Sequence, residues 1–574
     1  MKVLFLMAAV ILAACSSTEQ GASGAPQRAA EPIVVPKETG PVDAVMRSTP
    51  FSRGVNFSGW FESFSAQSIP FTKYSEQDFA NVKSLGADVV RLPVRMHSMT
   101  DGSPNYRLDP LLLKFLDFAV DWAEKHEIYL IIDNHSFDPV AKTKDDTDTI
   151  LVPVWEQIAR RYKDRSDLIV YEILNEPHGI SDKRWGEIQG LAIDAIRRHD
   201  KKHAIIVGGT EYNSIGKLNA IPRYSDDNLI YTFHFYDPYL FTHQGASWGS
   251  PPVLTTLAAV PFPADRRRMP KIPDNLKGTW IENSLNNSYW HDASPAALYV
   301  TLNKTVAFSR ERNVPVFCGE FGVYLINCLP EDRVRWYDFV TDAMERRNIS
   351  RTSWDYYGGF GIFNSEGRGD FNSDLNVDIV RALGFTPPAQ MPRIGGPLES
   401  GFYLYDDYPN RVLSAGSWGN NTDFSLYDTK SASGDFAIRW ANADQYNVFW
   451  FGFDKLEDFS NLLEAGFKLE FTARTEKPVQ FDIRFVNPES HESIPWRMRY
   501  TIDDKILPPD GKWHTVSIPL SQMKEHGAWV NAKQEWIGPK GEFSWKKIKQ
   551  LEFVAEYGNM KDLCVWFDSI EIKY

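Results

Sequence analysis

The chain has 574 residues, of which 43% are hydrophobic and 24% charged, and its formal net charge is −13. This length exceeds what one hydrophobic core supports, so two or more domains are expected. The negative balance, without an extended basic stripe, argues against nucleic acid or an anionic membrane surface as a partner and leaves neutral ligands open. The 18 Trp residues fit either core filling or sugar-binding surfaces.

Residues 1–14 have the pattern of a signal peptide. Lys2 precedes an apolar run over residues 3–12, which is too short to span a membrane as a mature helix, and Ala13-Ala14-Cys15 follows. This ending resembles a bacterial lipoprotein signal. The resemblance implies a lipid on Cys15 as the only link to a membrane, and Ser16 favours the outer membrane. A soluble secreted product is the alternative. Residues 15–50, rich in small and polar side chains, predict a flexible tether.

Residues 51–388 alternate strand-like runs with amphipathic helices, which indicates a parallel α/β fold. Strands are expected at 53–57, 88–94, 128–133, 168–174, 204–207, 229–233, 314–317 and 351–354. Helices are expected between them, near 149–162, 185–198, 296–312 and 331–347. Eight such units favour a closed (β/α)8 barrel over an open doubly wound sheet, since no Gly-rich phosphate loop follows the first strand.

The segment 237–292 is too long for a plain strand-to-helix loop and is expected to help build a substrate site. Its Trp248, Trp280 and Trp290 either stack on sugars or pack the loop onto the barrel, and packing is favoured for each.

Residues 389–397 are rich in Pro and Gly and predict a linker. Beyond it, residues 398–574 show strand-type alternation, which predicts an all-β sandwich or jelly roll. The expected strands are 436–440, 448–453, 467–472, 481–485, 496–500, 514–520, 551–555 and 565–572.

Two acids stand at the ends of predicted barrel strands. One apolar run ends in Asn175-Glu176-Pro177, and another ends in Glu320. Since the carboxyl ends of all barrel strands meet at one edge, these acids predict the pair that retaining glycoside hydrolysis requires. Five further residues at the ends of predicted strands could each have an ordinary structural role. It is improbable, however, that all of them would occur at one edge of the barrel without a shared function. They are Arg91, His135, His234, Tyr236 and Trp354.

Asn175-Glu176-Pro177, the later Gly319-Glu320-Phe321-Gly322 and the run from Arg53 to Trp60 resemble glycoside hydrolase family 5, over about residues 51–385. The resemblance implies that Glu176 is the acid/base and Glu320 the nucleophile, and that no metal or organic cofactor is needed. It also implies that Arg91 and Tyr236 keep the nucleophile ionised, that Asn175 donates to the sugar 2-hydroxyl, that His135 and His234 line the subsites around the cleaved bond, and that Trp354 lies beneath the −1 sugar. A negative neighbour is expected to raise the pKa of Glu176.

The closing pattern of the second domain, including Gly-Lys-Trp-His-Thr-Val-Ser-Ile-Pro-Leu at 511–520, resembles galactose-binding-like jelly-roll modules such as family 11 carbohydrate-binding modules. Trp450, Trp496 and Trp529 are then the expected ligand contacts. A purely structural sandwich stays open as the alternative.

The sequence thus predicts a lipid-tethered or secreted retaining endo-β-glycanase of the cell envelope, monomeric and acting on the polysaccharide β-1,4-glucan. Mannan, xyloglucan, and mixed-linkage or β-1,3-glucan are alternative substrates. A non-catalytic surface glycan-binding lipoprotein is the non-enzymatic alternative, and the intact pair Glu176 and Glu320 argues against it. Cys318, Cys328 and Cys564 match no zinc spacing, and a Cys318–Cys328 disulfide is left open.

Overall fold

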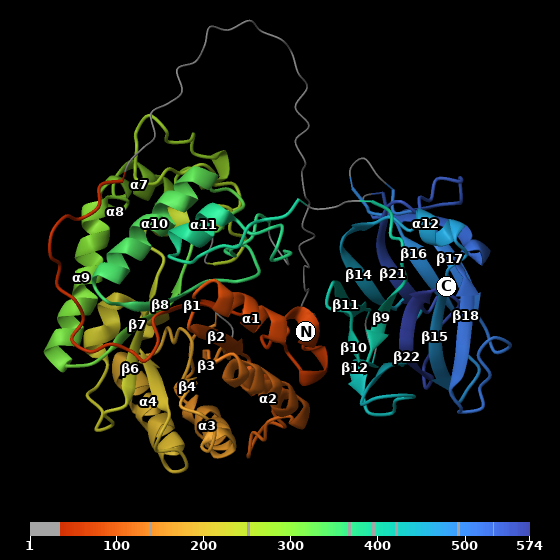
Figure 1. The fold of residues 1–574 in the computed structure, drawn as a ribbon, viewed down its shortest axis with the longest axis horizontal. Coiled ribbons are helices and arrows are strands. Elements are labelled where there is room, and N and C mark those ends of the chain that lie inside the picture. The colour runs from red at the N-terminus through yellow and green to blue at the C-terminus, as the bar shows by residue number, and fades with distance from the viewer. Residues whose placement is uncertain are drawn as a thin grey trace, which may run out of the picture. The chain divides into compact units, whose positions relative to one another are not determined.

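The computed structural model describes residues 35–137, 141–249, 253–365, 369–392, 396–419, 423–490, 494–531 and 533–574. The predicted signal peptide and its Cys15 lie outside the described residues. Within these ranges no helix combines the length and the apolar character that crossing a bilayer requires. The chain forms two compact units that divide near residue 393 (Figure 1).

The first unit contains a closed barrel of eight parallel strands in sequential order, which confirms the predicted (β/α)8 fold. The last strand closes onto the first, with Arg53 opposite Arg351 and Val55 opposite Ser353. The strands are β1 (Arg53–Asn56), β2 (Val89–Val94), β3 (Tyr129–Asn134), β4 (Ile169–Glu172), β5 (Ala204–Gly208), β6 (Leu229–Phe235), β7 (Val316–Phe321) and β8 (Ser350–Ser353).

Helices surround these strands, and α2, α3 and α4 lie outside β3 and β4 in Figure 1. Local sequence sets where they begin: the Asp109 side chain accepts the Leu111 N–H at 2.8 Å, and Pro110 occupies the first turn of α2. The main helices are α1 (Glu76–Ser84), α2 (Pro110–Lys125), α3 (Asp148–Tyr162), α4 (Asp182–Arg197), α9 (Pro295–Arg312), α10 (Pro330–Arg346) and α11 (Val377–Ala382). The short ones are α5 (Thr210–Asn213), α6 (Tyr239–Thr242), α7 (Trp280–Asn286) and α8 (Tyr289–Asp292).

An apolar cluster fills part of the barrel, with each side chain contributed by a different strand or by the segment before β1. Its buried members are Phe51, Val89, Ile131, Val170, Ile206, Ile230 and Phe317. Burial of one such side chain stabilises the fold by about 1.5–3 kcal/mol. Arg91 lies two residues after Val89 on β2 and is also buried. The barrel interior is therefore apolar at the level of Val89 and polar at the level of Arg91.

The second unit consists of antiparallel sheets, as predicted for an all-β domain. One sheet holds β9 (Phe402–Asp406), β10 (Tyr408–Pro409), β12 (Asp423–Asp428), β13 (Ala437–Ala441), β15 (Lys468–Thr475), β18 (His514–Pro519) and β22 (Cys564–Lys573). The other holds β11 (Leu413–Trp418), β14 (Val448–Glu457), β16 (Phe481–Val486), β17 (Arg497–Ile502), β19 (Lys524–Val530), β20 (Glu535–Ile537) and β21 (Ile548–Val554). A short helix, α12 (Ser460–Glu464), joins β14 to β15.

Aromatic rings join the two sheets. Phe449 of β14 stacks on Phe553 of β21 at 4.3 Å between ring centroids and meets Phe567 of the opposite sheet at 5.2 Å. All three side chains are buried. The sheets therefore pack face to face as a sandwich.

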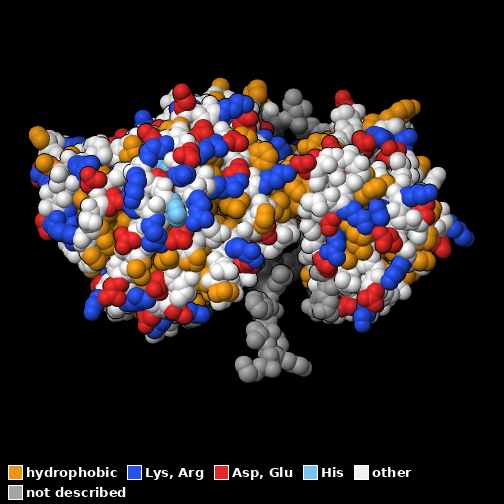
Figure 2. Space-filling model, turned by 90° about the horizontal axis from the view of Figure 1, so that it is seen from below, with side chains coloured by type: hydrophobic (Ala, Val, Ile, Leu, Met, Phe, Trp, Pro, Cys, Tyr) orange, Lys and Arg blue, Asp and Glu red, His pale blue; other side chains and the backbone are white. Residues whose placement is uncertain are grey.

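Three smaller predictions have structural outcomes. Cys318, Cys328 and Cys564 are free thiols, so the disulfide left open above is not formed. Met391, inside the predicted linker, donates its N–H to Asn372 O at 2.7 Å, so the chain still contacts the barrel unit there. On the face shown in Figure 2, acidic and basic side chains are interspersed.

Candidate active site

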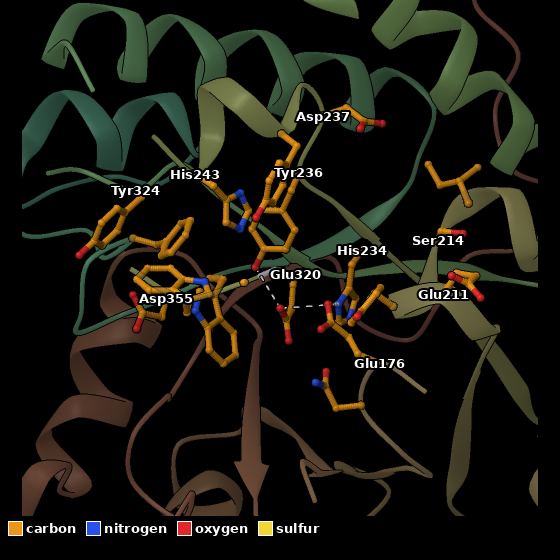
Figure 3. Close-up of a pocket in the computed structure, with 18 of the residues that line it drawn as sticks. Glu176, Glu211, Ser214, His234, Tyr236, Asp237, His243, Glu320, Tyr324 and Asp355 are labelled. Carbon is orange, nitrogen blue, oxygen red and sulfur yellow. Dashed lines mark hydrogen bonds and ion pairs between the residues drawn. The ribbon is translucent and has the colours of Figure 1, made fainter. Parts of the chain in front are cut away.

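A cleft of about 1170 Å³ lies where the barrel strands end (Figure 3). The predicted site residues that line it are His135, Asn175, Glu176, His234, Tyr236, Glu320 and Trp354. Arg91, the remaining predicted residue of the barrel site, is fully buried and contacts two of them, Asn175 and Glu320, from β2. The structure thus brings the whole predicted set together.

Glu176 and Glu320 face each other across this cleft. One carboxylate oxygen of each, together with a ring nitrogen of His234, lies within 4.8 Å of the others. His234 Nδ1 is 2.7 Å from Glu176 Oε1 and 3.6 Å from Glu320 Oε2. Glu320 is part of β7, whereas Glu176 lies beyond β4 with a φ of +47°, in the left-handed region that non-glycine residues rarely adopt. Such backbone strain is characteristic of functional sites.

Arg91 holds the polar network together. Its Nη1 donates to Glu320 Oε1 at 2.9 Å and to Asn56 Oδ1 at 3.0 Å. Its Nε and Nη2 donate to the two carboxylate oxygens of Glu172 at 2.7 and 2.9 Å. Nη2 also lies 3.0 Å from Asp133 Oδ2. One guanidinium therefore compensates several buried carboxyl groups, and its planar shape fixes their relative positions.

Tyr236 completes the environment of Glu320. Its hydroxyl donates to Glu320 Oε2 at 2.9 Å, so each oxygen of this carboxylate accepts a hydrogen bond, one from Tyr236 and one from Arg91. Burial raises the pKa of the Tyr236 phenol well above its usual value, and the negative charge of Glu320 adds to this effect. The phenol therefore keeps its proton and remains a donor at neutral pH.

Asn175, His135 and Trp354 form one connected group. The Asn175 amide oxygen accepts from Arg91 Nη2 at 2.9 Å, and its amide nitrogen lies 3.2 Å from His135 Nε2. Trp354 stacks on the His135 ring, with 5.6 Å between centroids and 17° between planes. Burial lowers the pKa of His135, but the charge and hydrogen bond of Asp133, together with the charges of Glu62 and Glu320, raise it to about 9. His135 is therefore cationic at neutral pH.

The pKa of Glu176 is raised to about 7. Burial is the largest cause, and the positive charges of His135 and Arg91 oppose it. The expected effect of a negative neighbour is present, because the charge of Asp133 raises this pKa, but burial raises it more. Burial also lowers the pKa of His234 to about 4, so this ring is neutral between the two glutamates.

The long segment after β6 contributes aromatic side chains to the cleft. Trp248 and Trp280 line it and are 46% and 49% exposed. Trp248 also packs on the barrel unit, with 4.9 Å between the centroids of its ring and that of Tyr324. Trp290 packs against Arg266 of the same segment, whose guanidinium lies 5.1 Å from the centre of its ring. Tyr239 and His243 of the same segment also line the cleft.

Sequence reasoning missed three residues that contact Arg91. Asn56, Asp133 and Glu172 lie inside strands rather than after them, and each is buried. For Asp133 and Glu172, a charged residue within an apolar strand run was the available signal, because an acid is rarely buried without a partner. Burial raises the pKa of Glu172 to about 7, against the opposing effect of Arg91.

Replacing Arg91 tests the importance of this network for stability. Arg91→Met leaves the buried carboxyl groups of Asp133, Glu172 and Glu320 without their shared cation, so unfolding free energy is expected to fall by about 3–5 kcal/mol. Denaturant unfolding measures this loss. The control is Arg161→Met, which removes a surface pair with Asp117 and is expected to cost about 1 kcal/mol or less. Equal stability of the two variants would contradict the role assigned to Arg91.

An eight-stranded parallel barrel with two facing carboxylates at its carboxyl edge is the arrangement that glycoside hydrolysis uses. Residues 48–359 match the family described as cellulase (glycosyl hydrolase family 5), and the chain belongs to this family. Residues 412–574 match the family described as carbohydrate binding domain 30.

Several endoglucanases are similar to this chain. Endoglucanase 3 of Fibrobacter succinogenes is 29% identical over 359 residues, covering 58% of this chain and 52% of that protein. Endoglucanase C of Acetivibrio thermocellus is 28% identical over 320 residues, covering 53% of this chain and 91% of that protein. Endoglucanase H of the same organism is 26% identical over 524 residues, covering 87% of this chain and 51% of that protein. The chain thus spans about half the length of Endoglucanase 3 and of Endoglucanase H.

Among solved structures, endoglucanase Cel5A of the hyperthermophilic Thermotoga maritima matches with 27% identity and a TM-score of 0.48, covering 58% of this chain and 96% of that one.

Proposed function

We propose that the barrel unit is a retaining endo-β-1,4-glucanase in which Glu320 is the nucleophile and Glu176 the acid/base. The observation that carries this proposal is the pair of facing carboxylates, with one oxygen of each within 4.8 Å of the other. Retaining enzymes place their carboxyl groups about 5–5.5 Å apart, whereas inverting enzymes leave room for a water at about 6.5–9.5 Å. The names of the similar endoglucanases support the choice of substrate.

In the first step, Glu320 attacks the anomeric carbon while Glu176 gives its proton to the departing glycosidic oxygen. The bond between that carbon and oxygen breaks, and a glycosyl ester of Glu320 forms. In the second step, Glu176 takes a proton from water, which attacks the same carbon and releases Glu320. The pKa of about 7 suits Glu176 for both roles, since it exchanges a proton near neutrality.

The neighbours of the two glutamates fit supporting roles in these steps. Arg91 and Tyr236 orient Glu320 through both of its oxygens. Asn175 accepts from Arg91 through its oxygen, and its amide nitrogen, 3.2 Å from His135 Nε2, lines the cleft as the donor to a sugar hydroxyl. The exposed face of Trp354, backed by His135, offers an apolar surface beneath a pyranose ring.

A panel of polysaccharides with product sizing tests the substrate and the mode of action. The proposal expects soluble β-1,4-glucan to be cut into long fragments early in the reaction, since the cleft of about 1170 Å³ is lined by several aromatic side chains and can hold more than one sugar. Release of only mono- or disaccharides from the start would contradict endo action. Preference for β-mannan or for β-1,3-glucan would contradict the substrate.

We further propose that the second unit binds glucan through the sheet that contains β14. Phe449 and Phe451 point into the core, so the alternation places Trp450 on the outer face. A Cβ atom at Gly416 or at Gly452 would lie only 3.1 Å from its indole ring. The ring therefore lies across the sheet over two glycines, with its other face available to a sugar. Of the other expected contacts, Trp529 is 37% exposed and Trp496 is buried.

Adsorption of the full chain to insoluble cellulose tests this binding surface. Trp450→Ala is expected to weaken adsorption roughly tenfold, about 1.4 kcal/mol, while hydrolysis of a soluble oligosaccharide stays unchanged. Trp566→Ala, a strand tryptophan of the other sheet, is the matched control. If both variants adsorb like the wild type, the sandwich does not bind through this surface.

The lipid anchor also remains a proposal, supported by the Leu12-Ala13-Ala14-Cys15 ending. Membrane fractionation of cells that produce the natural chain or Cys15→Ala tests it, because only the natural chain is expected in the envelope fraction.

A further inference from the structure

Phe64 is an exposed aromatic residue in the segment that follows β1. Its side chain is 77% exposed, whereas Phe57, Trp60 and Phe61 just before it are buried. A single exposed ring is ordinary on a protein surface, so what matters is how this ring is held and where it lies. None of the roles assigned above uses it.

The structure holds the Phe64 ring from one side. The guanidinium of Arg95 lies 4.2 Å from the centre of the ring, and a cation placed over an aromatic face is attracted to it. Two hydrogen bonds fix the neighbouring chain: the Arg95 N–H donates to Phe61 O at 3.0 Å, and the Ser98 hydroxyl donates to Ser63 O at 3.2 Å. Since the ring stays 77% exposed with one face against Arg95, its other face is open to solvent.

This ring lies at the catalytic edge of the barrel. Phe61 pairs with Val94, the last residue of β2, and Arg95 follows directly, so both segments lie at the carboxyl ends of strands. Glu62, two residues before Phe64, lines the catalytic cleft. Two residues of chain span at most about 7 Å, so Phe64 extends the cleft wall to which Glu62 belongs.

The two catalytic glutamates indicate which part of the substrate lies on each side. The general acid gives its proton to the departing oxygen, so the leaving sugars lie on the side of Glu176. In Figure 3, Asp355 and Glu176 lie on opposite sides of Glu320. The sugars that become attached to Glu320 therefore extend toward Asp355.

Glu62 lies on this second side. Its Oε1 is 3.8 Å from His135 Nε2, and the His135 ring stacks on Trp354, the residue before Asp355. With the first sugar over Trp354, Glu62 lies alongside the second, and the open face of Phe64 comes next. The C–H faces of a glucose ring are apolar and uncharged, which suits stacking on such an aromatic face.

We propose that Phe64 binds the third glucose of the substrate, counted from the cleaved bond toward the non-reducing end. This inference rests on the proposed function, since it needs Glu176 as the acid and β-1,4-glucan in the cleft. It adds a binding residue outside the predicted set, and it means that chains with three sugars on this side are cut faster than chains with two.

Aryl glycosides of increasing length test the inference with the full chain. The 4-nitrophenyl glycosides of cellobiose and cellotriose differ only by the third sugar, and counting released nitrophenol excludes cleavage within the sugar chain. The wild-type kcat/KM is expected to be roughly tenfold higher on the trioside, because binding energy from a distant sugar lowers the barrier. A wild-type ratio near one would overturn the inference.

Variants of Phe64 assign this gain to the ring. Phe64→Ala is expected to bring the ratio of trioside to bioside down to within about twofold of one, while kcat/KM on the bioside stays within about twofold of the wild type. The exposed position makes folding of this variant safe. Phe64→Trp keeps an aromatic face and should keep the gain. A Phe64→Ala enzyme with the wild-type ratio would overturn the inference.

Tyr212→Ala is the matched control. This ring also lines the cleft and is 45% exposed, but it stacks on His178, two residues after Glu176, and so lies on the side of the leaving group. Its loss should change both glycosides alike and leave their ratio as in the wild type. If the bioside is hydrolysed but the ratio does not depend on Phe64, only this inference fails. If neither glycoside is hydrolysed, the proposed function fails and the inference fails with it.

Discussion

Glu320→Gly is expected to lower kcat on soluble β-1,4-glucan by at least roughly 10⁴-fold, about 5.4 kcal/mol of barrier. The reason is that Glu320 supplies the oxygen that bonds to the anomeric carbon, and no neighbouring side chain can take over as nucleophile. Arg91 and Tyr236 already hold both of its oxygens, and the facing Glu176 keeps a proton near neutrality because burial raises its pKa to about 7. Initial rates of reducing-end formation measure the loss.

Azide separates loss of the nucleophile from general damage. With Gly at position 320 the space beneath the anomeric carbon is open, so azide can attack from the side that Glu320 occupied, and the glycosyl azide is expected to have inverted configuration. Glu320→Gln, which keeps the volume but lacks the charge, is the matched control and should stay inactive with azide. Near-normal turnover by Glu320→Gly, or a rescued product of retained configuration, would remove Glu320 from the nucleophile's role.

The barrel could be predicted because its strands are short apolar runs whose burial leaves a strong local signal. The predicted and observed strand ranges differ by a few residues at most, as for β3 at Tyr129–Asn134. The strand-end cluster was predictable for a related reason: residues that follow parallel strands share one edge of the barrel whatever their distance in sequence. Glu176 and Glu320 meet for this reason alone.

What could not be predicted depends on packing between distant segments. Glu172 was hidden inside an apolar strand, and only the barrel interior shows that it faces Arg91. Trp248 and Trp290 lie in the same long segment, yet one lines the cleft and the other packs on Arg266. Strand β11 was missed since Leu413–Trp418 carries little β-branched character, and its pairing with β14 determines its conformation.

The pH dependence of wild-type kcat/KM is expected to follow Glu176 on its alkaline side. A general acid acts only while protonated, and the pKa of Glu176 is raised to about 7. Activity on natural glucan should therefore fall tenfold per pH unit as pH rises well above 7. A carboxyl of ordinary pKa, about 4.3, would already have lost its proton at pH 6.

Glu176→Ala is expected to remove this alkaline limb and to lower kcat/KM on natural glucan by roughly 10²–10⁴-fold, the usual contribution of a general acid. The loss should nearly vanish for an aryl cellobioside whose phenol is acidic enough to leave without a proton, since Glu320 and its partners are untouched.

Turnover of that aryl cellobioside by Glu176→Ala then stalls at the glycosyl ester, because no base activates water. Azide should restore turnover and give a glycosyl azide of retained configuration. The opposite configurations expected from the Glu176 and Glu320 variants assign the two carboxylates independently of any structure. A Glu176→Ala enzyme that loses activity equally on glucan and on the activated cellobioside would show that this side chain shapes the site and transfers no proton.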